Sequence, residues 1–330
     1  MQTRTLGRTG RTVSVVGLGT WQLGADWGDV AEADAFAVLD AAYAAGVTFF
    51  DTADVYGDGR SESLIGSWLK ANAGSGVTVA TKMGRRVDQI PENYVLDNFR
   101  AWNDRSRSNL GVDTLDLVQL HCPPTPVYSS DEVFDALDTL VAEGRIRNYG
   151  VSVETAEEAL EAIRRPGIAS VQIILNAFRL KPLDEVLPAA AARAGVGIIA
   201  RVPLASGLLS GRYTLETTFS ADDHRTYNRQ GEAFDVGETF SGVDYEAGVR
   251  AAAEFSELVR STMPDVTPAQ AALAWIASLP QVSTVIPGAR NPDQARANAA
   301  AGSIELPEGF DESVRRLYDT YFREAIHGRW

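Results

Sequence analysis

Several features are scarce in this chain of 330 residues. It has one cysteine, three histidines and only three lysines, and its longest nearly unbroken apolar stretch, residues 271–279, ends at Pro280. One cysteine cannot form an internal disulfide, and this stretch is far shorter than the roughly 20 residues needed to cross a bilayer. The N-terminal residues also lack the apolar block of a secretory signal. We therefore expect a cytoplasmic protein that does not span a membrane.

Positive charge is outweighed as well, because 30 Lys and Arg face 44 Asp and Glu, for a formal net charge of −14. An acidic protein repels the phosphate backbone and anionic lipid, so nucleic acid and membranes are poor candidate partners. The histidines at 121, 224 and 327 do not have the spacing of zinc ligands, which gives a dedicated metal site little support. Hydrophobic residues make up 45% of the chain, enough to bury a large core.

Short apolar runs alternate with stretches of helical periodicity along the whole chain. The runs that predict strands are residues 15–20, 47–50, 77–81, 115–120, 146–151, 170–174, 196–200 and 282–286. Helices are expected near residues 32–45, 61–70, 92–110, 130–142, 154–164, 184–194, 268–278 and 291–300. Strict alternation of strand and helix requires a parallel sheet buried on both faces. Eight such units predict an α/β protein, a (β/α)8 TIM barrel formed by one domain over residues 1–330.

Three segments fall outside this repeat. Residues 3–12, with Gly7 and Gly10, predict an N-terminal β-hairpin before the first barrel strand. Residues 205–245 are polar and rich in Ser, Gly and Thr, and predict a long loop after strand 7, of a length that usually serves function. Residues 310–323 predict an extra C-terminal helix.

Polar side chains follow four successive strands at the point where each strand ends. These are Asp51, Lys82, His121 and Ser152, which are spaced about one βα unit apart. Because the active site of a parallel barrel forms at the C-terminal ends of its strands, we expect the four side chains to converge there.

Lys82 is the one lysine at the end of an apolar strand, and Asp51 on the adjacent strand is its available partner. Tyr56 lies five residues after Asp51, and an ammonium group near a phenol lowers the pKa of the phenol, which makes it a usable proton donor. Together with His121, this set can protonate or polarise a carbonyl oxygen. Two other readings stay open: a structural salt bridge at the barrel rim, or a Schiff base on Lys82 as in an aldolase.

Motifs along nearly the whole chain resemble the aldo-keto reductase superfamily. They are Gly17-Leu-Gly-Thr-Trp21, Phe50 to Gly57 with Ser61-Glu62, Thr81-Lys82, Gln119-Leu-His121, Gly150-Val-Ser152, Gln172 with Asn176, Pro203 to Gly211, and Ile286 to Arg290 with Asn298. The resemblance implies a barrel that binds NADPH and reduces an aldehyde or ketone, with hydride transfer from C4 of the nicotinamide. It implies Tyr56 as general acid, Lys82 to acidify it, Asp51 to hold Lys82, and His121 to orient the carbonyl.

The resemblance also implies the binding residues. Those for the cofactor are Thr20, Trp21, Asp51, Ser152, Gln172, Arg201, Pro203, Leu204, Ser206, Gly207, Leu209, Gly211, Gly288, Arg290, Gln294 and Asn298, and those for the substrate are Trp21, Tyr56 and His121.

Some positions depart from the family pattern. Val153 replaces a common asparagine, and Cys122 replaces an aromatic residue. Arg201 stands where many relatives stack an aromatic ring on the nicotinamide. A planar guanidinium can also stack on this ring. Gly288-Ala289 replaces a Lys-Ser pair, and Gln294 replaces the usual arginine. Arg290 is therefore expected to hold the 2′-phosphate of NADPH, and NADH stays possible.

A different functional class remains open beside the reductase. A barrel of this kind can serve as a nucleotide-binding sensor or regulatory subunit with weak reductase activity. The expected partner is a small-molecule carbonyl substrate; loop aromatics such as Trp27, Tyr227 and Phe234 show only that aromatic walls are available for it.

Overall fold

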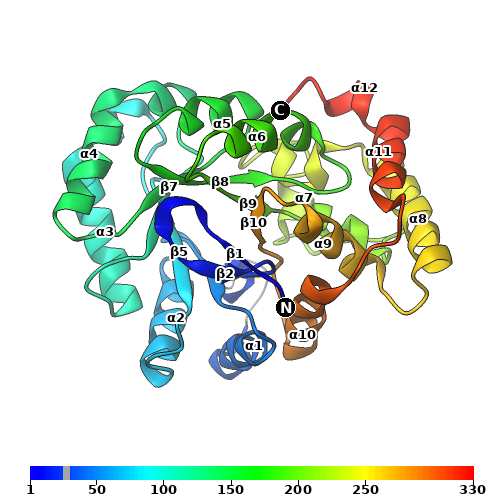
Figure 1. The fold of residues 1–330 in the computed structure, drawn as a ribbon, viewed down its shortest axis with the longest axis horizontal. Coiled ribbons are helices and arrows are strands. Elements are labelled where there is room, and N and C mark those ends of the chain that lie inside the picture. The colour runs from blue at the N-terminus through cyan, green and yellow to red at the C-terminus, as the bar shows by residue number, and fades with distance from the viewer. Residues whose placement is uncertain (25–29) are drawn as a thin grey trace.

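The structure, a computed structural model, describes residues 1–24 and 30–330, and its centre is a parallel sheet of eight strands (Figure 1). In sheet order the strands are β3 (Leu18–Gly19), β4 (Phe49–Asp51), β5 (Thr78–Met83), β6 (Leu117–His121), β7 (Tyr149–Ser152), β8 (Ile168–Ile174), β9 (Gly197–Arg201) and β10 (Val282–Val285). Parallel bridges from Val16 to Val285 and from Gly19 to Gly288 join the two edges. The sheet is thereby closed into the predicted (β/α)8 barrel.

Helices surround the barrel and alternate with its strands (Figure 1). They are α1 (Glu32–Ala44), α2 (Arg60–Ala71), α3 (Leu96–Leu110), α4 (Asp131–Ala142), α5 (Ala156–Ile163), α6 (Lys181–Ala192), α9 (Pro268–Ser278) and α10 (Pro292–Ala300). Their starts are encoded locally, since the hydroxyls of Thr155 and Thr267 accept the N3 backbone N–H in complete capping boxes. Within residues 1–24 and 30–330, none of the helices has the length and apolar character that crossing a membrane requires.

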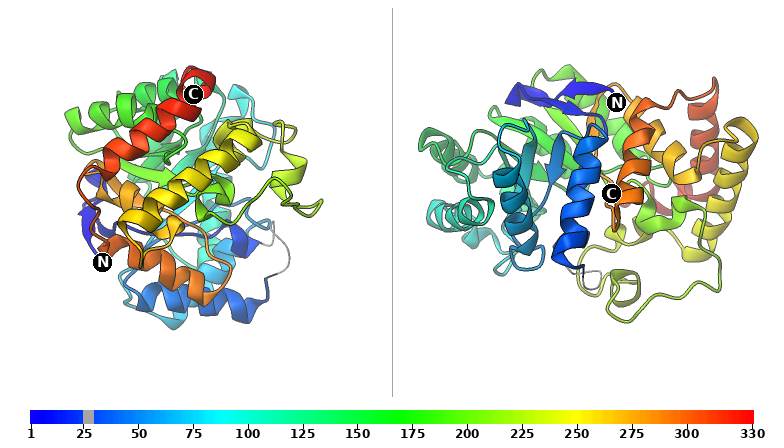
Figure 2. Two further views of the ribbon diagram at one scale, coloured as in Figure 1. Left: turned by 90° about the vertical axis from the view of Figure 1, so that its right-hand side faces the viewer. Right: turned by 90° about the horizontal axis from the view of Figure 1, so that it is seen from below.

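The predicted N-terminal hairpin consists of β1 (Thr3–Thr5) and β2 (Thr12–Ser14), paired antiparallel. Gly7, with φ of +48°, lies so close to the ends of β8 and β9 that an added Cβ would meet the Ala169 carbonyl oxygen at 2.2 Å. Leu6 and Val13 join the apolar cluster inside the barrel, which includes Phe49 and Ile199. The hairpin therefore covers the N-terminal mouth, and the loop of residues 205–245 extends from the opposite end (Figure 2).

The segment after β9 holds more structure than the sequence predicts. Residues 205–245 contain short 3-10 turns and α7 (His224–Tyr227), and they lead into α8 (Tyr245–Thr262), a helix that the apolar runs did not reveal. Asp244 caps α8 by accepting the Ala247 N–H, and α8 packs beside α11 (Phe310–Tyr321) (Figure 2). With the short α12 (Arg323–Ile326), α11 forms the predicted C-terminal extension.

Candidate active site

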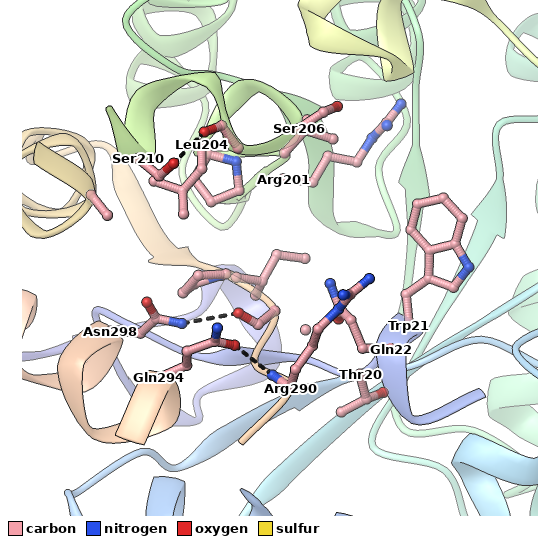
Figure 3. A pocket seen from close by; sticks show the side chains of 18 of the residues that line it. Thr20, Trp21, Gln22, Arg201, Leu204, Ser206, Ser210, Arg290, Gln294 and Asn298 are labelled. Carbon is pink, nitrogen blue, oxygen red and sulfur yellow. Dashed lines mark hydrogen bonds between the residues drawn. The ribbon is translucent and has the colours of Figure 1, made fainter. Parts of the chain in front are cut away.

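A cavity of about 640 Å³ lies at the C-terminal ends of the barrel strands, between them and the loop of residues 205–245 (Figure 3). Sixteen of the predicted site residues line it: Thr20, Trp21, Asp51, Tyr56, His121, Ser152, Gln172, Arg201, Pro203, Leu204, Ser206, Gly207, Gly288, Arg290, Gln294 and Asn298. The barrel register explains this convergence, since His121 pairs with Ser152 and Ser152 pairs with Gln172 on neighbouring strands.

Lys82 lies beneath the cavity and joins two of these residues. Its ammonium group donates to Asp51 Oδ1 at 2.5 Å, to the Thr52 carbonyl oxygen at 2.9 Å and to the Tyr56 hydroxyl at 3.3 Å. The side chains of Lys82 and Asp51 are 1% and 3% exposed, so this ion pair is almost fully removed from water. Gln172 donates to the second oxygen of Asp51 at 2.8 Å. Both carboxylate oxygens of Asp51 therefore accept a hydrogen bond, which offsets the cost of burying the charge.

The net effect on the Tyr56 phenol differs from the sequence expectation. Burial raises the pKa of Tyr56 above its ordinary value, and the nearby Lys82 ammonium, which lowers it, offsets this only in part. Burial also disfavours the charged Lys82, but Asp51 and Tyr56 outweigh it, and the pKa of Lys82 is raised. At neutral pH the pair is thus a neutral phenol that holds its proton beside a fixed ammonium charge, which can stabilise the phenolate once the proton leaves.

His121 lies on the same side of the cavity, with its ring centroid 6.0 Å from that of Tyr56. Burial, together with the positive charges of Arg85, Lys82 and Arg201, lowers the pKa of His121 well below its ordinary value. Its imidazole is therefore neutral and can donate one hydrogen bond, the form required to polarise a carbonyl oxygen without protonating it. Cys122, the next residue, is buried with a pKa raised to about 12, so its thiol is protonated and serves packing.

The guanidinium of Arg201 is held by hydrogen bonds along its edge. Its Nη2 donates to Glu154 Oε2 at 2.9 Å and to the Val153 carbonyl oxygen at 3.0 Å, and its Nη1 lies 3.7 Å from Glu238 Oε2. Arg85 binds the same two carboxylates. Cys122, Glu154 and Glu238 bring ligand-type atoms within 4.8 Å of one another, but the two guanidinium groups bound to these carboxylates disfavour a metal cation there.

Two predicted cofactor residues, Leu209 and Gly211, lie outside the cavity lining. The Leu209 side chain is fully buried in the apolar core, and Gly211, with φ of +69°, ends the 3-10 turn Ala205–Ser210 and faces Ser256. Leu209 thus anchors the turn in the core, whereas Gly211 is exposed. The part of the turn that holds Ser206 and Gly207, both in left-handed conformations, faces the cavity.

The end of the cavity away from Tyr56 is lined by polar side chains, among them Arg290, Gln294 and Asn298 (Figure 3). The Arg290 backbone N–H donates to Gln294 Oε1 at 2.8 Å, and Asn298 donates to the Gly288 carbonyl oxygen at 3.0 Å. At Gly288 an added Cβ would lie 2.2 Å from the Gln22 amide, so a larger residue here would require the Gln22 side chain to move. The cavity thus has polar groups at both ends, with Ser152 and Gln172 at one end and Arg290, Gln294 and Asn298 at the other.

Sequence reasoning missed several residues of the lining, namely Gln22, Arg212, Tyr213, His224, Arg225, Glu238 and Gln270. Most belong to the long loop, where no periodicity indicates which side chains face inward. His224 and Trp21 lie together with ring centroids 5.3 Å apart, and both contact Phe234, whose ring also contacts Tyr227. Of this aromatic cluster, Trp21 and His224 line the cavity, and the Trp21 ring stacks on that of Tyr56 with centroids 6.0 Å apart. Trp27 lies outside the described residues.

Comparison with known proteins agrees with this geometry. The model of the Aldo/keto reductase family matches residues 15–319. The aldo-keto reductase str7 of Strobilurus tenacellus is 33% identical over 289 residues, which cover 86% of this chain and 80% of that protein. This chain belongs to the aldo/keto reductase family, a family of oxidoreductases.

Solved structures show the same fold. The glycerol dehydrogenase AKR11B4 from Gluconobacter oxydans is 27% identical with a TM-score of 0.78, over 97% of this chain and 95% of that one. An aldo/keto reductase from Klebsiella pneumoniae, solved in complex with NADP and acetate, is 23% identical with a TM-score of 0.70, over 96% of each chain.

Proposed function

We propose that this protein reduces an aldehyde or ketone to the alcohol with NADPH, and that Tyr56 is the general acid. The observation that carries the proposal is the position of the Lys82 ammonium, which contacts both the Asp51 carboxylate and the Tyr56 hydroxyl beneath the cavity. A purely structural Lys82–Asp51 salt bridge would not require the contact between the Lys82 ammonium and the Tyr56 hydroxyl on the cavity side. A Schiff base would need a neutral amine, whereas the pKa of Lys82 is raised by Asp51 despite burial.

In this proposal the chain's own residues manage the proton and the charge. NADPH, when bound, supplies the hydride that reduces the carbonyl carbon. His121 donates a hydrogen bond to the carbonyl oxygen and orients it toward the Tyr56 hydroxyl, which gives its proton to that oxygen as the alcohol forms. Lys82 stabilises the resulting phenolate, and Asp51 keeps Lys82 charged and in place. The phenolate then regains a proton from water.

The cofactor and its contacts are part of the proposal. Ser152 and Gln172 would hold the nicotinamide carboxamide, the turn at Ser206 and Gly207 would face the pyrophosphate, and Arg290 with Gln294 would contact the 2′-phosphate. Family membership and the polar side chains at both ends of the cavity support this assignment. Asp51 holds Gln172 through the amide nitrogen, which leaves the Gln172 carbonyl oxygen as the acceptor for a carboxamide N–H.

A panel of aldehydes, ketones and sugars, assayed with NADPH and with NADH, tests the proposal. We expect turnover with NADPH, and a loss of at least about a hundredfold in kcat for Tyr56→Phe with little change in NADPH affinity. Turnover that survives in Tyr56→Phe would remove Tyr56 as the acid. NADPH binding without turnover of any carbonyl would instead favour the alternative, a nucleotide-binding regulatory subunit.

A further inference from the structure

Four charged side chains form a cluster beside the candidate active site: Arg85, Glu154, Arg201 and Glu238. Arg85 Nη2 lies 3.3 Å from Glu154 Oε1 and 3.1 Å from Glu238 Oε1, and Arg201 Nη2 lies 2.9 Å from Glu154 Oε2. The four side chains are between 9% and 20% exposed. Two positive and two negative groups thus compensate one another in a largely buried setting.

Glu238 belongs to the loop of residues 205–245 and is one of the cluster residues that line the cavity. Arg201 and Glu238 line the cavity together with Tyr56 and His121, whereas Arg85 and Glu154 lie behind them. Arg201 lies on the wall that also carries Ser206 (Figure 3). Glu238 and Tyr56 line the same cavity, and the Glu238 charge adds to the causes that raise the pKa of the phenol.

The two oxygens of Glu238 are engaged differently. Oε1 accepts a hydrogen bond from Arg85 at 3.1 Å, while Oε2 is 3.7 Å from Arg201 Nη1, beyond hydrogen-bonding distance. The Glu154 carboxylate also lies within 4.8 Å, and burial together with this neighbour raises the pKa of Glu238. A carboxylate oxygen has lone pairs for more than one donor, so Oε2 can accept a further hydrogen bond from a group in the cavity. The groups that suit it are hydroxyls; a second carboxylate would be repelled.

We propose, on the basis of the proposed function, that Glu238 selects the substrate class: uncharged carbonyl compounds with a hydroxyl near the carbonyl, such as hydroxyaldehydes, in preference to carbonyl compounds with a carboxylate. Glu238 accepts the substrate hydroxyl while Tyr56 and His121 hold the carbonyl oxygen. Glu154 binds both arginines, so with Glu238 in place neither presents an uncompensated positive charge to an anionic substrate. Trp21 and His224 supply the opposite, aromatic surface for the C–H groups of a short chain.

The test compares matched substrates. Values of kcat/KM are measured with NADPH for glyceraldehyde against propanal, and for succinic semialdehyde against butanal. We expect the wild-type protein to favour glyceraldehyde over propanal by about tenfold or more, the effect of one hydrogen bond to a charged group. It should favour butanal over succinic semialdehyde.

Two variants separate hydrogen bonding from charge. Glu238→Ala removes the acceptor and should lower the glyceraldehyde-to-propanal ratio by about tenfold. Glu238→Gln keeps the volume and one acceptor oxygen but leaves two guanidinium groups with one carboxylate, and should raise the ratio of succinic semialdehyde to butanal by about tenfold. Glu216→Gln, at an exposed carboxylate of the same loop, is the matched control and should change neither ratio.

Quenching of tryptophan fluorescence by NADPH shows that each variant is folded, and Glu238→Gln carries the test if Glu238→Ala does not bind NADPH. Wild-type protein that reduces glyceraldehyde and propanal equally well, or variants with unchanged ratios, would overturn this inference and leave the reductase proposal intact. If no carbonyl compound is reduced at all, both proposals fall.

Discussion

Replacing Lys82 by methionine separates its structural role from its chemical one. Methionine keeps the length of the side chain but removes the ammonium that contacts Asp51 and Tyr56. The Asp51 carboxylate, 2% exposed, would then be held by the amides of Gln172 and Gln119 alone. An ionised group buried without its counter-ion is strongly destabilising, so both folding and turnover should suffer.

The expected magnitudes follow from the burial of the pair. Loss of one partner from a buried ion pair costs about 3–5 kcal/mol of unfolding free energy. Loss of charge stabilisation at the general acid lowers kcat by about a hundred- to ten-thousandfold. In the double variant Asp51→Asn with Lys82→Met, no buried charge is left uncompensated, so most of the lost stability should return while the activity stays lost.

Urea unfolding and NADPH absorbance measure the two quantities. Lys181→Met is the matched control: this lysine also donates to a carboxylate, Glu157 at 2.8 Å, but Glu157 is 67% exposed, and the variant should lose less than about 1 kcal/mol and no activity. Two results would refute the reasoning: Lys82→Met that is as stable as Lys181→Met, or a double variant that regains turnover.

Three further predictions concern other side chains. Asp54 is fully buried, and burial together with Glu62 raises its pKa to about 7. From about pH 4 to pH 7 the folded protein therefore holds a proton that the unfolded chain releases, so the free energy of unfolding should fall by up to about 4 kcal/mol as the pH rises. Urea unfolding of Asp54→Asn should show a flatter pH profile than the wild type, and an identical profile would contradict the assignment. Arg290→Ala should weaken NADPH binding in fluorescence titration by about tenfold with little effect on NADH, whereas equal losses would exclude a contact with the 2′-phosphate. His121→Ala should lower kcat/KM about a hundredfold at unchanged NADPH affinity; if the variant is unfolded by circular dichroism, His121 is primarily structural.

The sequence was most informative where periodicity determines position. Alternating apolar runs placed all eight barrel strands, because strands buried on both faces leave nearly continuous apolar segments. Polar residues at the ends of successive strands, such as Asp51, Lys82 and His121, were predicted to converge because a parallel barrel brings those ends to one mouth. The structure places Asp51 and His121 in the cavity lining and Lys82 beneath it.

Contacts between loops were not predictable in this way. Glu238 reaches Arg85 and Glu154, which follow β5 and β7, and no spacing in the sequence links these three positions. The same contacts hold the edge of the Arg201 guanidinium, and its stacking on the nicotinamide stays a prediction. The sequence also could not show whether the pKa of Tyr56 is raised or lowered. The outcome depends on the balance between burial, which raises this pKa, and the nearby Lys82 ammonium, which lowers it.

Transfer of deuterium tests the central claim most directly. The protein is supplied with an aldehyde and NADPH stereospecifically deuterated at C4, and the alcohol is analysed by mass spectrometry. With one of the two C4 epimers we expect wild-type protein to yield alcohol with one deuterium on the carbinol carbon, and Tyr56→Phe, though it still binds NADPH, to yield almost none. Alcohol without deuterium from both epimers, or equal labelling by wild type and Tyr56→Phe, would contradict direct transfer to a carbonyl that Tyr56 protonates.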